Sequence, residues 1–249
     1  MFGIALTFAA GTIAGRSLLH VLPSRFAVDL AQPLVVTTNW NGYGVMFWLV
    51  LAAVVAIAFI PYTAQLRAPL SLSGTLAASA LALGAAFFWL PLMSSDVYAY
   101  AAYGEMARLG LDPYLYHQSL ADALVQAANW QWRPVQVPVC VYGPAFVLVA
   151  QAVVAALHEA GIAAVLDGFR LLSCAALLLC GYLAYVIDGN RAAAFIACNP
   201  VALFTAIEGH NDTLMVAVVL AGVALARRTP AIGAALAASA DADADAAGH

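Results

Sequence analysis

The amino-acid sequence predicts an all-α fold, a polytopic transmembrane helical bundle with a long loop outside the membrane. Of its 249 residues 65% are apolar and 9% are charged, whereas soluble domains have about 45–50% apolar and about 25% charged residues. Several stretches are also almost free of charge over about 20 residues, the length that a helix needs to cross ~30 Å of hydrocarbon. A soluble fold of this length could not bury so much apolar surface, so we expect a lipid bilayer around the chain.

Three apolar windows at residues 2–22, 43–61 and 70–92 predict membrane-spanning helices in an N-terminal unit, residues 1–93. We interpret the first window as a retained span, because no basic residue precedes Phe2 and no clean small-residue cleavage pattern follows the apolar run.

A long loop, residues 94–142, interrupts this pattern with charged, tyrosine and tryptophan residues. Aromatic residues gather at membrane–water interfaces, and loops this long inside a compact architecture are usually functional. We therefore expect interfacial helices and the catalytic residues of the protein in this loop.

Membrane helices resume over residues 143–230. The apolar segments are 144–157, 169–187, and a hairpin of 192–208 and 212–226 whose first arm should be kinked by Pro200. The remaining residues, 231–249, end in an alternating Ala-Asp run that predicts a disordered tail, and we interpret it as the end of a truncated reading frame.

Arginines give the orientation, because cytoplasmic loops are enriched in basic residues. Arg67, Arg191 and the pair Arg227-Arg228 would be cytoplasmic, which places the 94–142 loop and the turn after residue 207 outside. Two full crossings between these regions would instead carry Arg191 outside. Either 144–157 is a half-helix in the outer interface or Arg191 breaks the rule, and a helix of that length covers only ~21 Å, which favours the half-helix.

Composition excludes one class of partner. The net charge is −4 and no basic run is present, so we expect no nucleic acid, whose phosphates require clustered Lys and Arg. The four cysteines form no C-x-x-C pair, and we expect them to act as small packing residues.

Asp96 follows the third apolar window almost directly, so it should lie at the outer membrane boundary. A partly desolvated carboxylate there can serve as a general base. Asp96 can equally cap the helix that begins at Val97, and the two roles are compatible. The tyrosines that follow fit either an aromatic belt of an interfacial helix or a platform on which a sugar ring stacks.

A second polar cluster, Glu208, His210, Asn211 and Asp212, lies between two apolar arms. Ionisable residues at membrane depth are functional candidates, although a solvated hairpin turn with Asp212 as a helix cap would have the same sequence. Imidazole and carboxylate groups also suit divalent ions. The spacing does not demand a metal, so we assign no metal ligands and leave a divalent cation open as a cofactor.

Four motifs carry a resemblance to a known family. They are Ser95-Asp96-Val97-Tyr98-Ala99-Tyr100 with Gly104, then Gly110-Leu111-Asp112-Pro113-Tyr114, then Tyr142-Gly143-Pro144, then Asn199-Pro200 followed by Gly209-His210-Asn211-Asp212-Thr213-Leu214-Met215. In this order they resemble the GT-C superfamily of polytopic membrane glycosyltransferases, and most closely the bacterial polyprenol-phosphomannose-dependent α-1,6-mannosyltransferases.

The resemblance implies inverting transfer of a sugar, mannose in the closest relatives, from a polyprenyl-phosphate donor to a glycan or lipid acceptor outside the cytoplasmic membrane. Asp96 matches the family's catalytic aspartate, and the resemblance implies that it is the general base. The substrate-binding residues would be Tyr98, Glu105, Tyr142, Asn199, His210, Asn211 and Asp212. Members of the family are considerably longer, so the resemblance also implies that this chain is a truncated transferase.

Two alternatives remain. A transporter or flippase for a lipid-linked glycan would use broken helices and polar turns to line a path near the membrane centre, whereas here the ionisable residues gather at one predicted face. An inactive transferase fragment is the other alternative, since the segments that would complete a lipid-phosphate site are missing from the sequence.

Overall fold

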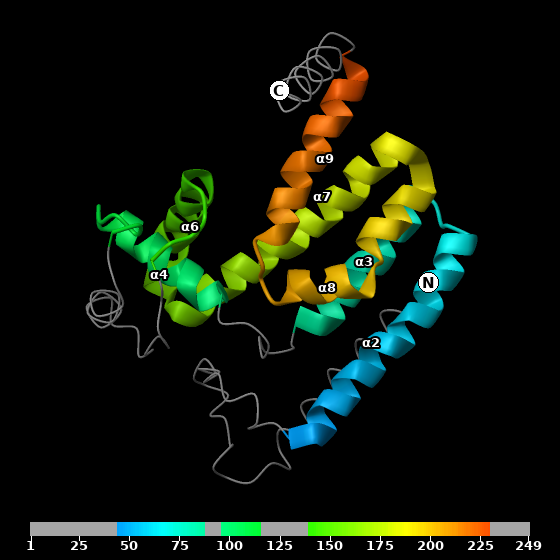
Figure 1. Cartoon of the computed structure of the whole chain (residues 1–249), viewed down its shortest axis with the longest axis horizontal. Coiled ribbons are helices and arrows are strands. Elements are labelled where there is room, and N and C mark those ends of the chain that lie inside the picture. Colours follow the sequence, from blue (N-terminus) through cyan, green and yellow to red (C-terminus); the bar gives the residue numbers. More distant parts are fainter. Residues whose placement is uncertain (1–43, 88–95, 116–138, 230–249) are drawn as a thin grey trace, which may run out of the picture.

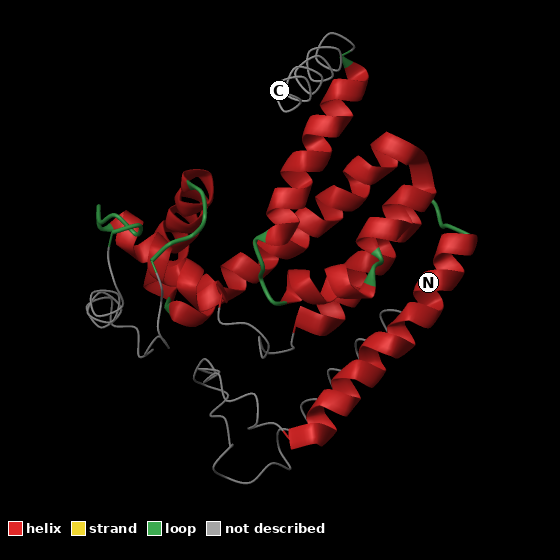
Figure 2. Ribbon diagram, viewed as in Figure 1, coloured by secondary structure: helices red, strands yellow, loops and turns green. Residues whose placement is uncertain are grey.

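The structure, a computed structural model, describes residues 44–87, 96–115 and 139–229, and in the first of these ranges the side chains from Ala52 onward. Every regular element in these ranges is a helix (Figure 2), which confirms the all-α prediction. The predicted first span at 2–22, the tail at 231–249 and the central part of the long loop lie outside the described residues.

Seven α-helices and one 3₁₀ helix make up this part of the chain (Figure 1). They are α2 (Gly44–Arg67), α3 (Leu72–Phe87), α4 (Asp96–Arg108), α6 (Pro144–Leu157), the 3₁₀ helix η3 (His158–Ala160), α7 (Ile162–Ala197), α8 (Pro200–Ile207) and α9 (Asp212–Arg228).

Helix α7 organises the molecule. Helices α3, α8 and α9 pack along it, while α4 and α6 pack on each other and on its N-terminal end (Figure 1). In the described part of the chain, α7 is the one helix that is long and apolar enough to cross a membrane by length and composition. The apolar windows of the sequence predict several membrane spans, and the described residues contain one helix that meets this criterion.

Helix α7 is broken at Asp188 and Gly189, whose backbone dihedrals are not helical, with Gly189 at φ +74°. The break produces two arms that run in opposite directions (Figure 1). The first arm ends where the predicted 169–187 segment ends but begins earlier, directly after Gly161 at φ +87°. Arg227 of α9 donates a hydrogen bond to the carbonyl of Ile187, so the C-terminal end of α9 lies beside this break.

The predicted 192–208 segment is two helices in the structure, because the chain breaks at Asn199 rather than bending at Pro200. The side chain of Asn199 accepts hydrogen bonds from the backbone N–H groups of Val201 and Ala202. It thereby caps α8, and Pro200 occupies the first turn, where its missing N–H leaves no hydrogen bond unmade.

Other predicted boundaries agree more closely. Helix α6 has the predicted bounds 144–157, with a proline in its first turn. Helix α2 continues through Pro61 to Arg67, beyond the predicted end at residue 61. Helix α9 begins at Asp212, as predicted, and ends at Arg228 with two arginines in its last turn, where cations complement the helix dipole.

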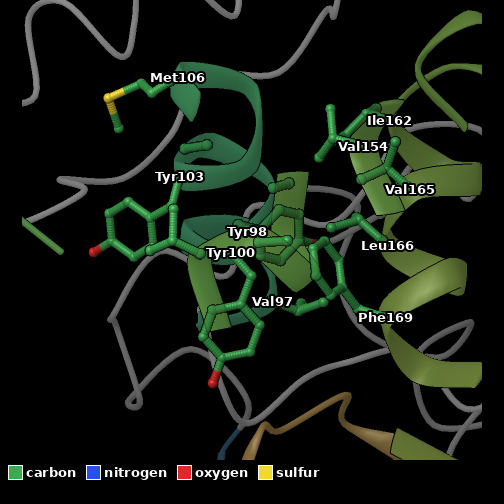
Figure 3. Packing of buried hydrophobic residues seen from close by; sticks show 14 of the residues in the cluster. Val97, Tyr98, Tyr100, Tyr103, Met106, Val154, Ile162, Val165, Leu166 and Phe169 are labelled. Atoms are coloured by element: carbon green, nitrogen blue, oxygen red, sulfur yellow. The ribbon is translucent and has the colours of Figure 1, made fainter. Parts of the chain in front are cut away.

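The largest buried cluster joins α4, α6 and the start of α7 (Figure 3). Val97, Tyr98 and Tyr100 of α4 lie against Phe169 of α7, and Tyr100 contacts this ring edge to face at 5.8 Å between centroids. A second cluster joins α2, α3, α7 and α8. The first cluster fixes the position of α4, the helix that begins with Asp96.

Candidate active site at the start of α4

Asp96 and His210 meet at the N-terminal end of α4. Oδ2 of Asp96 lies 3.4 Å from Nδ1 of His210, and their side chains are 44% and 22% exposed respectively. Asp96 is the first residue of α4, and His210 belongs to the 208–211 turn between α8 and α9. The structure therefore brings the two polar clusters of the sequence into one site that solvent can reach.

A second contact lies one helical turn further along α4. The hydroxyl of Tyr100 donates to Oδ1 of Asn211 at 3.2 Å, and both side chains are buried. Residues four apart share one face of a helix. Asp96 and Tyr100 therefore contact neighbouring residues of the 208–211 turn. Tyr100 was absent from the predicted site residues, which contained Tyr98. The i, i+4 spacing from Asp96 is the signal that could have identified it.

The 208–211 turn depends on Gly209, which adopts φ +79°. A Cβ atom at this position would lie 3.3 Å from side-chain atoms of both Arg170 and Val97. An L residue rarely adopts this dihedral, and the neighbours leave little room. The glycine lets the chain reverse closely over α7 and α4.

Charge surrounds the imidazole of His210. Its hydrogen bond with Asp96 raises the pKa of His210 above the ordinary 6.5, burial opposes the shift, and the negative charges of Asp96, Glu208 and Asp212 reinforce it. Asp96 thus has an electrostatic partner as well as access to solvent.

Aromatic rings form one wall beside the carboxylate. The Tyr100 ring lies 5.1 Å from that of Tyr142 and 4.7 Å from that of Phe146, in both cases edge to face. Burial raises the pKa of the Tyr142 hydroxyl, and the charges of Asp96 and Asp212 add to this shift. Half-buried Tyr142 therefore lies close to both aspartates, as expected for a ring at the edge of the site.

The structure places three predicted substrate-binding residues elsewhere. Tyr98 is 4% exposed and packs in the α4 cluster. Glu105 is buried at the other end of α4, where both carboxylate oxygens accept hydrogen bonds from Arg108 at 2.7 and 2.8 Å. Asn199 caps α8 at the end remote from His210. These contacts give each residue a structural role, and their part in substrate binding stays a prediction.

The described residues contain no group of three or more His, Cys, Asp or Glu residues that could hold a metal ion. Asp96 and His210 form a pair, and Asp212 contributes a charge nearby. The side chains of Asp96 and His210 can transfer a proton and can form hydrogen bonds with hydroxyl or phosphate groups.

Comparisons with known proteins bear on this site. Alpha-(1->6)-mannopyranosyltransferase A of Mycobacterium tuberculosis is 31% identical over 198 residues, which cover 75% of this chain and 35% of that protein. Alpha-(1->6)-mannopyranosyltransferase A of Corynebacterium glutamicum is 30% identical over 147 residues, 56% of this chain and 29% of the relative. The chain thus spans about a third of the length of these relatives. No solved structure matches it.

The family model described as "Alpha-(1->6)-mannopyranosyltransferase, N-terminal domain" matches residues 1–247. This range includes the four motifs identified in the sequence and both halves of the Asp96–His210 pair. The match covers nearly the whole chain, and the chain therefore belongs to the alpha-(1->6)-mannopyranosyltransferase N-terminal domain family.

Proposed function

We propose that this chain takes part in inverting transfer of mannose from a polyprenyl-phosphate donor to a glycan or lipid acceptor outside the cytoplasmic membrane, with Asp96 as the general base. The observation that carries the proposal is the 3.4 Å approach of Asp96 and His210. It joins, in a partly exposed site, the first and the last of the four motifs that carry the resemblance to polyprenol-phosphomannose-dependent transferases.

In the proposed reaction the Asp96 carboxylate removes the proton of an acceptor hydroxyl while that oxygen attacks the anomeric carbon. The bond from this carbon to the phosphate oxygen breaks, and polyprenyl phosphate leaves with the bonding electrons. A single displacement inverts the anomeric centre and needs one base, since no covalent intermediate forms. Asp96 suits this role because a carboxylate can accept a proton, and its side chain is 44% exposed beside His210.

The 208–211 turn and its neighbour Asp212 supply the remaining polar groups. A protonated His210 adds positive charge where the anionic phosphate of the donor would lie, and Asp212, exposed at the start of α9, can accept hydrogen bonds from sugar hydroxyls. Tyr142 offers a ring face of the kind that apolar sugar faces contact. These assignments extend the predicted roles of His210, Asn211, Asp212 and Tyr142.

The distribution of charge supports a multi-pass position in the cytoplasmic membrane. Helix α9 rises about 22 Å from Asp212 to Arg227, most of the ~30 Å of a hydrocarbon core. The first arm of α7 carries no charged residue between Arg170 and Asp188. Helix α9 also exposes large apolar side chains, among them Met215, Val218, Val219 and Leu225, as a lipid-facing helix does.

In this arrangement the site faces outside and the arginines face the cytoplasm. Arg227 lies beside the break at Asp188, where the first arm of α7 ends. His210 contacts Ser173, which lies 15 residues before Asp188 on the same arm. Helices α4 and α6 both lie at the site end, which supports the half-helix interpretation of residues 144–157. A transporter would instead need polar groups along these helices near the membrane centre.

Replacement of Asp96 by Asn tests the proposal, because the amide keeps the shape of the side chain and cannot accept the proton. We expect Asp96→Asn to lower mannose transfer from polyprenyl-phosphate donor by at least about a hundredfold, measured in membranes that hold the full-length protein. The variant should still be expressed and folded in these membranes.

Asp188→Asn is the matched control, since it removes the same charge from an exposed carboxylate at the break in α7, away from His210. We expect it to retain transfer activity. Wild-type rates in Asp96→Asn, or equal losses in both variants, would remove Asp96 as the base.

A further inference from the structure

Two side chains of α7 hold the backbone of the turn that carries His210. The hydroxyl of Ser173 donates to the carbonyl oxygen of His210 at 2.8 Å, and Nε of Arg170 donates to the carbonyl oxygen of Ile207 at 2.8 Å. Ser173 is 1% exposed and Arg170 is 5% exposed. One bond lies on each side of Gly209, so the turn is fixed to α7 at both ends.

Each of the two donors is itself held in place. The guanidinium of Arg170 also donates to the carbonyl of Phe87, pairs with Asp167 at 3.0 Å and lies 4.4 Å above the Phe87 ring. The hydroxyl of Thr213 lies 2.6 Å from that of Ser173. These contacts leave the two donors little freedom, which is what a rigid support for a site requires.

We propose that Ser173 and Arg170 are positioning residues that fix the 208–211 turn on α7 and thereby hold the imidazole of His210 against Asp96. The inference rests on the proposed function only for its effect on transfer; the placement of His210 can be measured without substrate. Neither residue touches the reacting atoms. Both act through the backbone of the turn, and α7 thus supports the base on α4 from across the site.

The pKa of His210 indicates where the imidazole lies, because it depends on the charged groups that face the ring. These are Asp96 from α4 and Glu208 and Asp212 from either end of the turn; from α7, the Cγ atom of Arg170 lies beside Gly209. If the turn loosens, the hydrogen bond with Asp96 weakens and the pKa of His210 falls toward its ordinary value. Titration of His210 by NMR, in the full chain with ¹³C-labelled histidine and with His210→Gln for assignment, follows this directly.

We expect Ser173→Ala to lower the pKa of His210 and to reduce the turnover of mannose transfer on the order of tenfold, with little change in the KM for the donor. Ser173→Thr keeps a hydroxyl group, so the pKa of His210 and the turnover should stay close to those of the wild type. Ser79→Ala is the matched control: Ser79 is also 1% exposed and donates to a backbone carbonyl, that of Ala197, at 2.8 Å, but lies away from the site. It should leave the His210 titration unchanged.

Two further variants keep the test decisive if Ser173→Ala does not fold. Thr213→Val preserves the shape of the side chain and removes its hydroxyl from the network, and Arg170→Lys keeps the charge but not the planar fork that reaches two carbonyls. Each variant should lower the pKa of His210, as Ser173→Ala should. An unchanged titration in the folded variants overturns the positioning role. A shifted titration in a protein without transferase activity would refute the proposed function and leave the positioning role intact.

Discussion

Gly104 of α4 lies so close to Ala150 of α6 that a Cβ atom at position 104 would be 2.5 Å from the Ala150 carbonyl oxygen. The close approach brings the two helix backbones together where the α4 cluster is most completely buried. It follows that the position of α4, and with it that of Asp96, depends on a residue without a side chain.

Gly104→Ala should therefore destabilise the fold. The added methyl group meets backbone atoms of Ala150 and a methyl group of Val154 at 2.7 Å, so the helices must separate, and overpacking of this kind costs about 1–3 kcal/mol. Gly84→Ala in α3 is the control, because a Cβ there meets nothing within 4 Å and alanine favours a helix by roughly 0.5–1 kcal/mol. Thermal unfolding in detergent should show Tm changes of opposite sign; two changes of the same sign would contradict the close contact.

The hydrogen bond from Tyr100 to Asn211 gives a second prediction. Tyr100→Phe keeps the buried ring and removes the donor, which leaves Oδ1 of buried Asn211 without this partner. We expect a loss of about 1–3 kcal/mol in the free energy of unfolding, measured by denaturation in detergent. Tyr114→Phe provides the comparison, since its acceptor, the carbonyl of Tyr142, lies in an exposed contact where water can replace the hydroxyl. Equal losses in the two variants would be evidence against the Asn211 contact.

Helix positions were predictable from the sequence where local signals agree. The proline at residue 144 and the apolar run after it predict α6 with its bounds, and the polar residues at 188–191 and 208–212 predict the ends of the longer segments. The break at Asn199 was expected only as a kink. A proline can bend a helix or begin one, and the choice depends on whether the preceding side chain caps the N–H groups, as Asn199 does here.

The site was predictable in part for a similar reason. Asp96 and the residues of the 208–211 turn are conspicuous because they are polar among apolar neighbours, and the structure brings them together. Ser173 lies inside an apolar run with no local pattern to mark it. Ser173 is of interest because it contacts His210, which lies 37 positions further along the chain. The sequence of the α7 segment alone does not indicate this contact.

The pKa of His210 predicts a pH dependence of stability. Folding raises this pKa above 6.5, so the folded protein binds the proton more tightly than the unfolded chain does. The stabilisation is complete below the ordinary pKa and is lost as the pH rises through the raised pKa of the folded state. We expect the Tm difference between wild type and His210→Gln to shrink as the pH rises above the ordinary histidine pKa of about 6.5. A Tm difference that stays constant as the pH rises from below to well above this value would show that the pair does not form.

The proposed orientation of the chain places the site and the C-terminal arginines of α9 on opposite sides of the membrane, which can be tested by cysteine labelling. Val141, 77% exposed beside Tyr142, belongs to the site end, and Thr229, exposed after Arg228, to the arginine end. We expect Val141→Cys to react with a membrane-impermeant thiol reagent applied to intact cells, and Thr229→Cys to react only after the membrane is opened. The described cysteines Cys140, Cys174, Cys180 and Cys198 are all buried, so the wild-type chain should remain unlabelled as the control. If both engineered thiols react from the same side, the site and the arginines share a face, and the proposed crossing by α7 and α9 is wrong.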